Sequence, residues 1–568
     1  MVKGTGASAG IGIGKVVVLE EAKLVIKREI VADIEAEALR FKEALVVFAA
    51  NTKALAEDME KRIGSKEAEI LMSQSFMMQD PELTGAIENA IREECLNTEA
   101  AVDHVCNMYA DIFASMDDEL MQQRATDMRD IKTRIQKILL GIQDLDVAAL
   151  PQGTVIIAED LTPSITAGIH AENVMGIVTE LGGKTSHTAI LARALEIPAV
   201  VAAVDILKSV KNGDTVIVDG SEGLVLINPE TDVQDGYISR RDTYLKEKKE
   251  LEKYIGMPSV TKDGVRVELA GNIGKPEDVD KVLQYDGEGV GLFRTEFLFM
   301  DRTEMPTEEE QFEAYKKVAI TMNGKPVIIR TLDIGGDKEI PYMGLTKDEN
   351  PFLGYRAIRF CLDRKDIYNV QLRALLRASA FGNIKIMVPL VTCIEELREV
   401  KAMIKELMAE LDAKKVSYNK DIPVGIMVET AAASLMADVF AKEADFFSIG
   451  TNDLTQYTMS VDRGNGRVAY LYSTFNPAVL RSIKHVITCG REAGIMVGMC
   501  GEAASDPMMI PLLLAFGLNE FSMSASAILS SRKMITEYST KELQAIADKA
   551  MSFDTAGEVE AYMKEFIE

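Results

Sequence analysis

The chain has 568 residues, of which 47% are hydrophobic and 27% charged, enough for roughly three to four globular domains with ample cores. The formal net charge of -26 argues against nucleic acid or an anionic membrane as the main partner. The six cysteines show no zinc-site spacing and the first residues form no apolar leader. We therefore expect a cytoplasmic protein with reduced thiols and no membrane insertion.

The first part of the chain predicts an α/β sheet interrupted by helices. A strand is expected at 15–19, and from about 31 to 142 apolar residues recur at helical spacing, which predicts about four antiparallel helices. The pattern then changes to short β-rich runs at 154–158, 174–179, 199–201, 215–219 and 224–228. We expect the strand at 15–19 to complete the sheet of these runs, so the helices form an insertion.

One of the four histidines occupies a distinctive turn in this α/β part. His187 follows Gly182-Gly183-Lys184-Thr185-Ser186, between the strand at 174–179 and a helix expected at 186–195 that Thr185 or Ser186 caps. The unpaired N–H groups of a first helical turn favour an anion on the imidazole, such as a phosphoryl group. A lone histidine on a helix is more often structural, but the other three histidines lack this setting.

A charged helix is expected at 235–254, as a solvated connection. Beyond residue 261, eight candidate strands alternate with helical stretches, at 267–271, 289–294, 327–331, 384–389, 424–429, 446–449, 496–500 and 520–524. Eight βα units in this length predict a (β/α)8 barrel, whose active site lies at the C-terminal ends of the strands.

Charged side chains gather at those strand ends. Arg294, Arg330 and Arg463 each lie at or just after a strand, and arginine binds phosphate and carboxylate through paired hydrogen bonds. One such arginine is more often part of a surface salt bridge. Three at one mouth indicate a small ligand with several negative charges.

Two further groups at the strand ends suggest chemistry. Glu429 and Asp453 end consecutive strands, and two carboxylates beside a phosphate ligand suit Mg²⁺, with Mn²⁺ equally acceptable; the alternative is that one carboxylate balances an arginine. Cys500 ends the next strand. A buried cysteine is usually structural, but one facing a cationic pocket could protonate a carbanion or enolate.

These motifs resemble the enzyme I family of the bacterial phosphoenolpyruvate-dependent sugar phosphotransferase system over essentially the full length. The resemblance rests on the residues 182–188 around His187, and on the stretches Asp333-Ile334-Gly335-Gly336-Asp337-Lys338, 445–457, 291–300 and Gly498-Met499-Cys500-Gly501-Glu502. It implies an α/β multidomain protein in which a phosphohistidine α/β domain with an inserted helical bundle precedes a (β/α)8 barrel.

The resemblance also implies a division of the chain and a role for each part. The phosphohistidine subdomain would comprise 1–30 and 145–230, the helical carrier-binding subdomain 31–144, the linker helix 231–258, and the barrel, which binds phosphoenolpyruvate and forms a homodimer, 259–568. His187 would accept the phosphoryl group on Nε2 and pass it to a histidine-containing phosphocarrier protein. Arg294, Arg330, Asn452, Asp453 and Arg463 would hold phosphoenolpyruvate, Glu429 and Asp453 would bind Mg²⁺, and Cys500 would protonate the enolate.

Some positions depart from the family pattern. Ala431 replaces a proline after the metal strand, Ala202 replaces a frequent glycine, and Ser75 lies where many members carry a histidine. A dikinase or phosphoenolpyruvate synthase would need a large ATP-binding domain before the histidine, where only about 150 mostly helical residues stand. A non-catalytic phosphorylation sensor remains the alternative of a different class, and the intact set of mouth residues argues against it.

Overall fold

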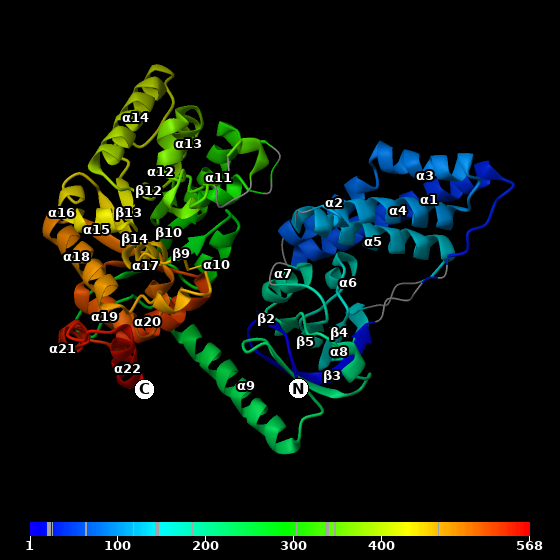
Figure 1. Cartoon of the computed structure of the whole chain (residues 1–568), viewed down its shortest axis with the longest axis horizontal. Coiled ribbons are helices and arrows are strands. Elements are labelled where there is room, and N and C mark those ends of the chain that lie inside the picture. The colour runs from blue at the N-terminus through cyan, green and yellow to red at the C-terminus, as the bar shows by residue number, and fades with distance from the viewer. Residues whose placement is uncertain are drawn as a thin grey trace. The chain divides into compact units, whose positions relative to one another are not determined.

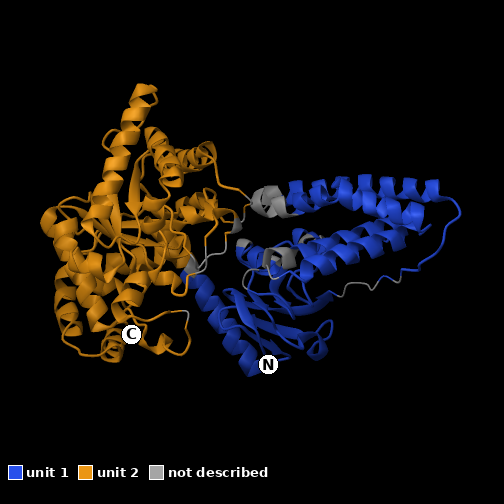
Figure 2. Ribbon diagram, turned by 45° about the horizontal axis from the view of Figure 1, so that its top comes forward, with its two compact units in different colours: residues 1–248 blue, residues 249–568 orange. Residues whose placement is uncertain are grey.

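The computed structural model describes residues 1–568 except 20–23, 25, 63–64, 117–118, 143–146, 184–185, 301, 303, 336–339, 346–347 and 464. The chain forms two compact units, Met1–Lys248 and Lys249–Glu568 (Figure 2). No helix in the described ranges is both long and apolar enough to cross a membrane. The finer division of the chain into four parts stays a prediction.

The first unit is built on an eight-stranded mixed sheet. Its strands follow the order β1-β8-β7-β3-β4-β5-β6-β2. Their bounds are β1 Val2–Lys3, β2 Thr5–Ser8, β3 Ile11–Leu19, β4 Thr154–Ala158, β5 Val174–Thr179, β6 Ala199–Val201, β7 Thr215–Asp219 and β8 Leu224–Ile227. Strand β3 pairs parallel with β4 and antiparallel with β7, which confirms that the N-terminal strand completes the sheet.

Among the described residues, five α-helices lie between β3 and β4 along the chain (Figure 1). They are α1 Ile34–Arg62, α2 Ser65–Met77, α3 Pro81–Glu93, α4 Thr98–Ala114 and α5 Glu119–Leu140. Buried apolar side chains from these helices, among them Phe41, Phe48 and Ile131, form a core separate from that of the sheet. The sequence predicted about four helices, because apolar spacing continues from one helix into the next without a clear break.

The remaining helices of this unit are short, apart from the last. They are α6 Pro163–Ala167, α7 His187–Ala194, α8 Ile206–Ser209 and α9 Thr231–Leu251. The departure at Ala202 has a physical consequence, because this residue adopts a φ of +53°. That left-handed conformation costs a residue with a Cβ roughly 1–2 kcal/mol, which explains why glycine is favoured at this position.

The second unit is a closed barrel of eight parallel strands, in the order β10-β11-β12-β13-β14-β15-β16-β9. The strands are β9 Glu268–Ile273, β10 Gly289–Arg294, β11 Val327–Arg330, β12 Ile384–Val388, β13 Val424–Val428, β14 Phe446–Ile449, β15 Met496–Met499 and β16 Glu520–Met523. All eight predicted strands are present, so the predicted fold class is confirmed.

Helices surround the barrel and cover the outer faces of its strands (Figure 1). They are α10 Asp278–Gln284, α11 Glu308–Thr321, α12 Ile358–Asp363, α13 Lys365–Ala378, α14 Ile394–Ala413, α15 Ala431–Leu435, α16 Ala437–Phe440, α17 Thr451–Met459, α18 Pro477–Ala493, α19 Ile510–Phe516, α20 Ile528–Glu537, α21 Thr540–Ala550 and α22 Ala556–Ile567. Their apolar faces and the outward-facing strand residues form the largest core of the protein.

A second, smaller apolar cluster belongs to residues of the strands themselves, including Leu292, Ile328, Met427 and Phe446. A carboxyl group is buried in the same barrel. Glu520, the first residue of β16, is 2% exposed, and burial raises the pKa of its side chain to about 8. The group therefore carries a proton at neutral pH.

This burial predicts a pH-dependent stability. The unfolded chain releases the Glu520 proton near the ordinary value of 4.5, whereas the folded chain keeps it up to about 8. Between these pH values the folded state binds more protons, so Glu520 lowers the free energy of unfolding as pH rises, by at most about 1.4 kcal/mol per pH unit. Glu520→Gln should remove this slope.

Urea unfolding of the full chain at several pH values between 5 and 8 measures the difference. The Gln variant should gain stability relative to the wild type as pH rises. The exposed Glu313→Gln is a matched control and should show no such gain. Parallel curves for wild type and Glu520→Gln would contradict the burial argument.

Candidate active site at the barrel mouth

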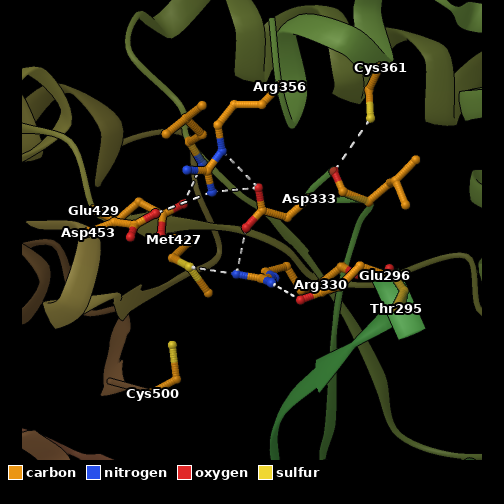
Figure 3. Close-up of polar contacts among 12 residues, drawn as sticks. Thr295, Glu296, Arg330, Asp333, Arg356, Cys361, Met427, Glu429, Asp453 and Cys500 are labelled. Carbon is orange, nitrogen blue, oxygen red and sulfur yellow. Dashed lines mark hydrogen bonds and ion pairs between the residues drawn. The ribbon is translucent and has the colours of Figure 1, made fainter. Parts of the chain in front are cut away.

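The C-terminal ends of the barrel strands bring most of the predicted residues together. Arg330 ends β11, Glu429 directly follows β13, Cys500 directly follows β15, and Asp453 lies in the first turn of α17. All four side chains are buried. Figure 3 shows them around the mouth, with Cys500 set apart from the charged network.

Arg330 is held from two sides by carboxylates. Its Nη2 lies 2.6 Å from Glu296 Oε1, and its Nη1 lies 3.0 Å from Asp333 Oδ2. Burial opposes the charge of this guanidinium, but the nearby carboxylates outweigh that effect and raise the pKa of Arg330. Its Nε and Glu296 Oε2 are buried and have no hydrogen-bond partner among the residues that the structure describes, so the pair keeps donor and acceptor capacity.

Arg356 is the second buried guanidinium of the mouth. Its Nη2 lies 2.8 Å from Asp333 Oδ1 and 3.3 Å from Asp453 Oδ2, so it links the two carboxylates (Figure 3). The sequence analysis missed this residue, because it lies in the long connection after β11 rather than at a strand end. An isolated β-bridge between Arg356 and Gly335 holds this part of the connection in place. Such a bridge leaves no periodic pattern in the sequence from which it could be predicted.

Glu429 is an acid whose proton is unusually hard to remove. Burial, and then the negative charges of Asp453 and Asp333, raise the pKa of Glu429 to about 8, while Arg330 and Arg356 act in the opposite direction. Its Oε1 accepts a hydrogen bond of 2.6 Å from the backbone N–H of Leu390. The charge of Asp453 therefore opposes ionisation of Glu429, and a cation between the two carboxyl groups would remove that opposition.

The segment after Glu429 keeps a defined helix start despite its departure from the family pattern. Ala431 is the first residue of α15, a position where proline is favoured because no N–H is required. Thr430 caps the helix, since its Oγ1 accepts from the N–H of Ala433 at 3.0 Å and donates to the carbonyl of Val391 at 2.8 Å. These bonds fix the segment without the rigid ring.

The other two predicted arginines lie nearer to solvent. Arg463 Nη2 is 3.6 Å from Asp453 Oδ1, and 41% of its side chain is exposed. Arg294 ends β10 in register with Arg330, and its exposed guanidinium lies over the ring of Phe297. The structure thus joins Arg463 to the network, and places Arg294 at the same level of the barrel without a carboxylate contact recorded among the described residues.

Cys500 and Asn452 lie on neighbouring segments. Burial raises the pKa of the Cys500 thiol to about 12, so the sulfur keeps its proton at neutral pH. Its Sγ lies 3.8 Å from the carbonyl oxygen of Ile449. Asn452 Oδ1 accepts a hydrogen bond of 3.4 Å from the N–H of Glu502, which orients the amide near the mouth.

His187 begins α7 in the first unit, as the sequence predicts. Ser186 is the N-cap, and its Oγ accepts a hydrogen bond from the N–H of Ala189 at 3.3 Å. Gly182 adopts a φ of +94°, which allows the turn before the helix. Lys184, Thr185 and the side chain of His187 lie outside the described residues.

The described residues contain no group of three or more His, Cys, Asp or Glu side chains arranged to hold a metal ion. Glu429 and Asp453 are only two such ligands, so a cation there would need oxygen atoms from a substrate or from water.

Comparisons with known proteins identify related chains over the full length. Family models match residues 3–124 as the N-terminal domain of PEP-utilising enzymes, 150–223 as their mobile domain and 248–540 as their PEP-binding domain. A phosphoenolpyruvate-protein phosphotransferase of Bacillus subtilis (strain 168) is 48% identical over 99% of both chains. That of Staphylococcus carnosus (strain TM300) is 47% identical over 100% of this chain and 99% of the relative. A solution NMR structure of an enzyme I protein, 40% identical, covers 43% of this chain and 99% of its own, with a TM-score of 0.38.

Proposed function

The chain belongs to the phosphoenolpyruvate–protein phosphotransferase family, and we propose on this basis that His187 Nε2 takes the phosphoryl group of phosphoenolpyruvate. The phosphohistidine then passes the group to a histidine of a small phosphocarrier protein, and pyruvate leaves. This is the first step of sugar uptake by the phosphotransferase system. The observation that carries the proposal is the buried arginine–carboxylate network at the barrel mouth.

The network suits a small, strongly anionic substrate. Arg330 and Arg356 are buried and held by Asp333, so their guanidinium groups are already desolvated and oriented. Arg463 and Arg294 are more exposed and can approach the ligand from the solvent side. Fixed donors of this kind stabilise a phosphoryl group during transfer without having to rearrange.

Glu429 and Asp453 would hold the Mg²⁺ ion, or Mn²⁺ in its place. The residues fit such an ion, because two buried carboxylates with mutual repulsion are the hard oxygen ligands that it prefers. When bound, the ion supplies positive charge next to the phosphate and carboxylate oxygens of the substrate. Asn452, beside Asp453, would donate to the same substrate.

Cys500 would deliver the proton that converts the enolate into pyruvate. Its thiol is protonated at neutral pH and lies at the end of β15, facing the barrel mouth. His187, at the first turn of α7, would hold its phosphoryl group where helix N–H groups and the dipole favour negative charge.

The remaining assignments follow the family. The helices α1–α5 would dock the phosphocarrier protein, with Ser75 on α2 altering the details of that contact. The barrels would pair into a homodimer, and the protein would act in the cytoplasm.

Replacing the acceptor histidine tests the function directly. Incubation with ³²P-labelled phosphoenolpyruvate and Mg²⁺, without ATP, should give acid-labile label on the wild type. His187→Ala should give none, because no other group would accept the phosphoryl group. His170→Ala, in the same unit, should label like the wild type. Absence of label on the wild type would favour a phosphorylation sensor instead.

Replacing Glu429 tests the metal assignment. Glu429→Gln should raise the Mg²⁺ concentration for half-maximal pyruvate formation by at least about tenfold, since one anionic ligand is lost. In the wild type this concentration should fall as pH rises towards 8, because Mg²⁺ must displace the Glu429 proton. The exposed Glu502→Gln is the control. An unchanged Mg²⁺ titration for Glu429→Gln would count against the assignment.

Replacing Cys500 tests the proton donor. Cys500→Ala should slow pyruvate formation by roughly 100-fold, because general acid catalysis is lost. Phosphorylation of His187 from the phosphorylated carrier should proceed at the wild-type rate, since that step forms no enolate. The exposed Cys393→Ala serves as the control. Equal losses in the two directions would exclude a role limited to the enolate.

A further inference from the structure

The barrel interior holds a carboxyl group that the proposed function does not use. Glu520 is 2% exposed, and neither of its carboxyl oxygens has a hydrogen-bond partner among the described residues. Burying an unpaired polar group lowers stability, so each such group in a folded protein needs an explanation.

Two glycines make the room for this carboxyl group. A Cβ on Gly498 would lie 1.9 Å from Glu520 Oε2, and a Cβ on Gly291 would lie 2.0 Å from Glu520 Oε1. Any other residue at either position would therefore collide with the acid. The carboxyl group extends over both glycine backbones, and Gly498 belongs to the strand that ends at Cys500.

The strand register places a serine in the same row as this acid, across Gly498. Ser448 pairs with Gly498, and Gly498 pairs with Glu520, so the three residues form one row across β14, β15 and β16. Neighbouring strands are about 4.8 Å apart, and residues two apart on a strand share a face. Cys500 therefore lies on the same face as Gly498, diagonally next to Ser448, and the Glu520 carboxyl extends over Gly498 towards both.

Ser448 is free to carry a proton between the two groups. Its hydroxyl is fully buried and makes no hydrogen bond of normal geometry within the described part of the chain, yet it lies close enough to Cys500 to lower the pKa of the thiol. Ser522, the other hydroxyl near Glu520, donates its proton to Asn272 Oδ1 at 2.6 Å. Of these two hydroxyl groups, only that of Ser448 has a proton that is not already donated in a hydrogen bond.

We propose that Glu520 supplies, through the Ser448 hydroxyl, the proton that replaces the one Cys500 gives to the enolate, a role that rests on the proposed function. As the thiol S–H bond breaks, the proton forms a C–H bond on the enolate methylene. The thiolate takes the Ser448 proton, Ser448 takes the Glu520 proton, and the electron pair of the broken O–H bond remains on Glu520.

The relative acidities give this transfer its direction. Burial raises the pKa of Glu520 to about 8 and that of Cys500 to about 12, so the carboxyl is by far the stronger acid. Without a supply, the barrel would retain a thiolate that can take its proton back from pyruvate. Once the negative charge has moved to Glu520, Cys500 is a thiol again. It can then no longer remove the proton from the methyl group of the bound pyruvate.

The other end of the barrel would return the proton from solvent. The charged groups that act on Glu520 are Glu268 on β9, which raises its pKa, and Lys385 on β12, which lowers it. Both are half-buried. Lys385 would stabilise the carboxylate until it is reprotonated, and the other groups near Glu520 are Gly291, Gly498, the serines and Cys500.

A multiple-turnover experiment separates this role from a structural one, because each turnover after the first needs a new proton on Cys500. Full-length enzyme is mixed with excess phosphoenolpyruvate, the histidine-containing phosphocarrier protein and saturating Mg²⁺ from pH 6 to 9.5, and both pyruvate and His187 labelling are followed. In the wild type, pyruvate formation should fall above about pH 8 as Glu520 loses its proton. Glu520→Gln should be at least about tenfold slower at pH 7 and should lack that fall near pH 8.

Two serine variants test the route. Ser448→Ala should slow pyruvate formation to a similar extent as Glu520→Gln, whereas Ser522→Ala should keep the wild-type rate. Slowing by Ser522→Ala in place of Ser448→Ala would overturn the proposed route. The pH-dependent stability of Glu520→Gln shows independently that the variant folds.

The same samples also distinguish failure of the inference from failure of the proposed function. Glu520→Gln that forms pyruvate at the wild-type rate, with or without the fall above pH 8, overturns the inference while labelling of His187 leaves the proposed function intact. A Glu520→Gln that also loses labelling from the phosphorylated carrier overturns the inference as well, because that direction needs no proton. Absence of both pyruvate and label in the wild type would overturn the proposed function together with the inference.

Discussion

A buried chain of alternating charges determines what the barrel mouth can do. Glu296, Arg330, Asp333, Arg356 and Asp453 follow one another at ion-pair distance. Such a chain is weak evidence for stability, since desolvation offsets much of the attraction. Its consequence is positional: each guanidinium is fixed by two carboxylates, so a substrate anion meets donors that are already oriented.

Burial raises the pKa of Glu429, Cys500 and Glu520, and the neighbours of each group decide what it can do. Glu429 faces other carboxylates, which favours a cation beside it. Cys500 has few polar contacts and keeps its proton until a strong base arrives. Glu520 faces Glu268, which raises its pKa, and Lys385, which lowers it, so it can hold either a proton or a charge. One physical effect would therefore serve all three proposed roles, which are metal binding, proton donation and proton storage.

The sequence predicted the barrel well, because strands buried on both faces appear as short apolar runs of fixed length. The positions of Arg330, Glu429 and Cys500 at the strand ends were predicted for the same reason, since each directly ends such a run. Strands β1 and β2 were missed because they are short, and β2 contains a glycine. Glu296 and Arg356 were missed because loop geometry, which leaves no period in the sequence, brings them to the mouth.

Glu520 escaped prediction for a different reason. A polar residue at the first position of a strand normally lies at the solvent-exposed end, and only the register with Gly498 and the close approach to Gly291 show that its side chain turns inward. In a sequence pattern of alternating apolar residues, the two glycines give no sign that they make room for a buried acid. Because Gly291 and Gly498 have no side chains, the barrel interior has room for an acid behind the thiol. The positions without side chains therefore matter to the proposed proton transfer as much as the acid and the thiol themselves.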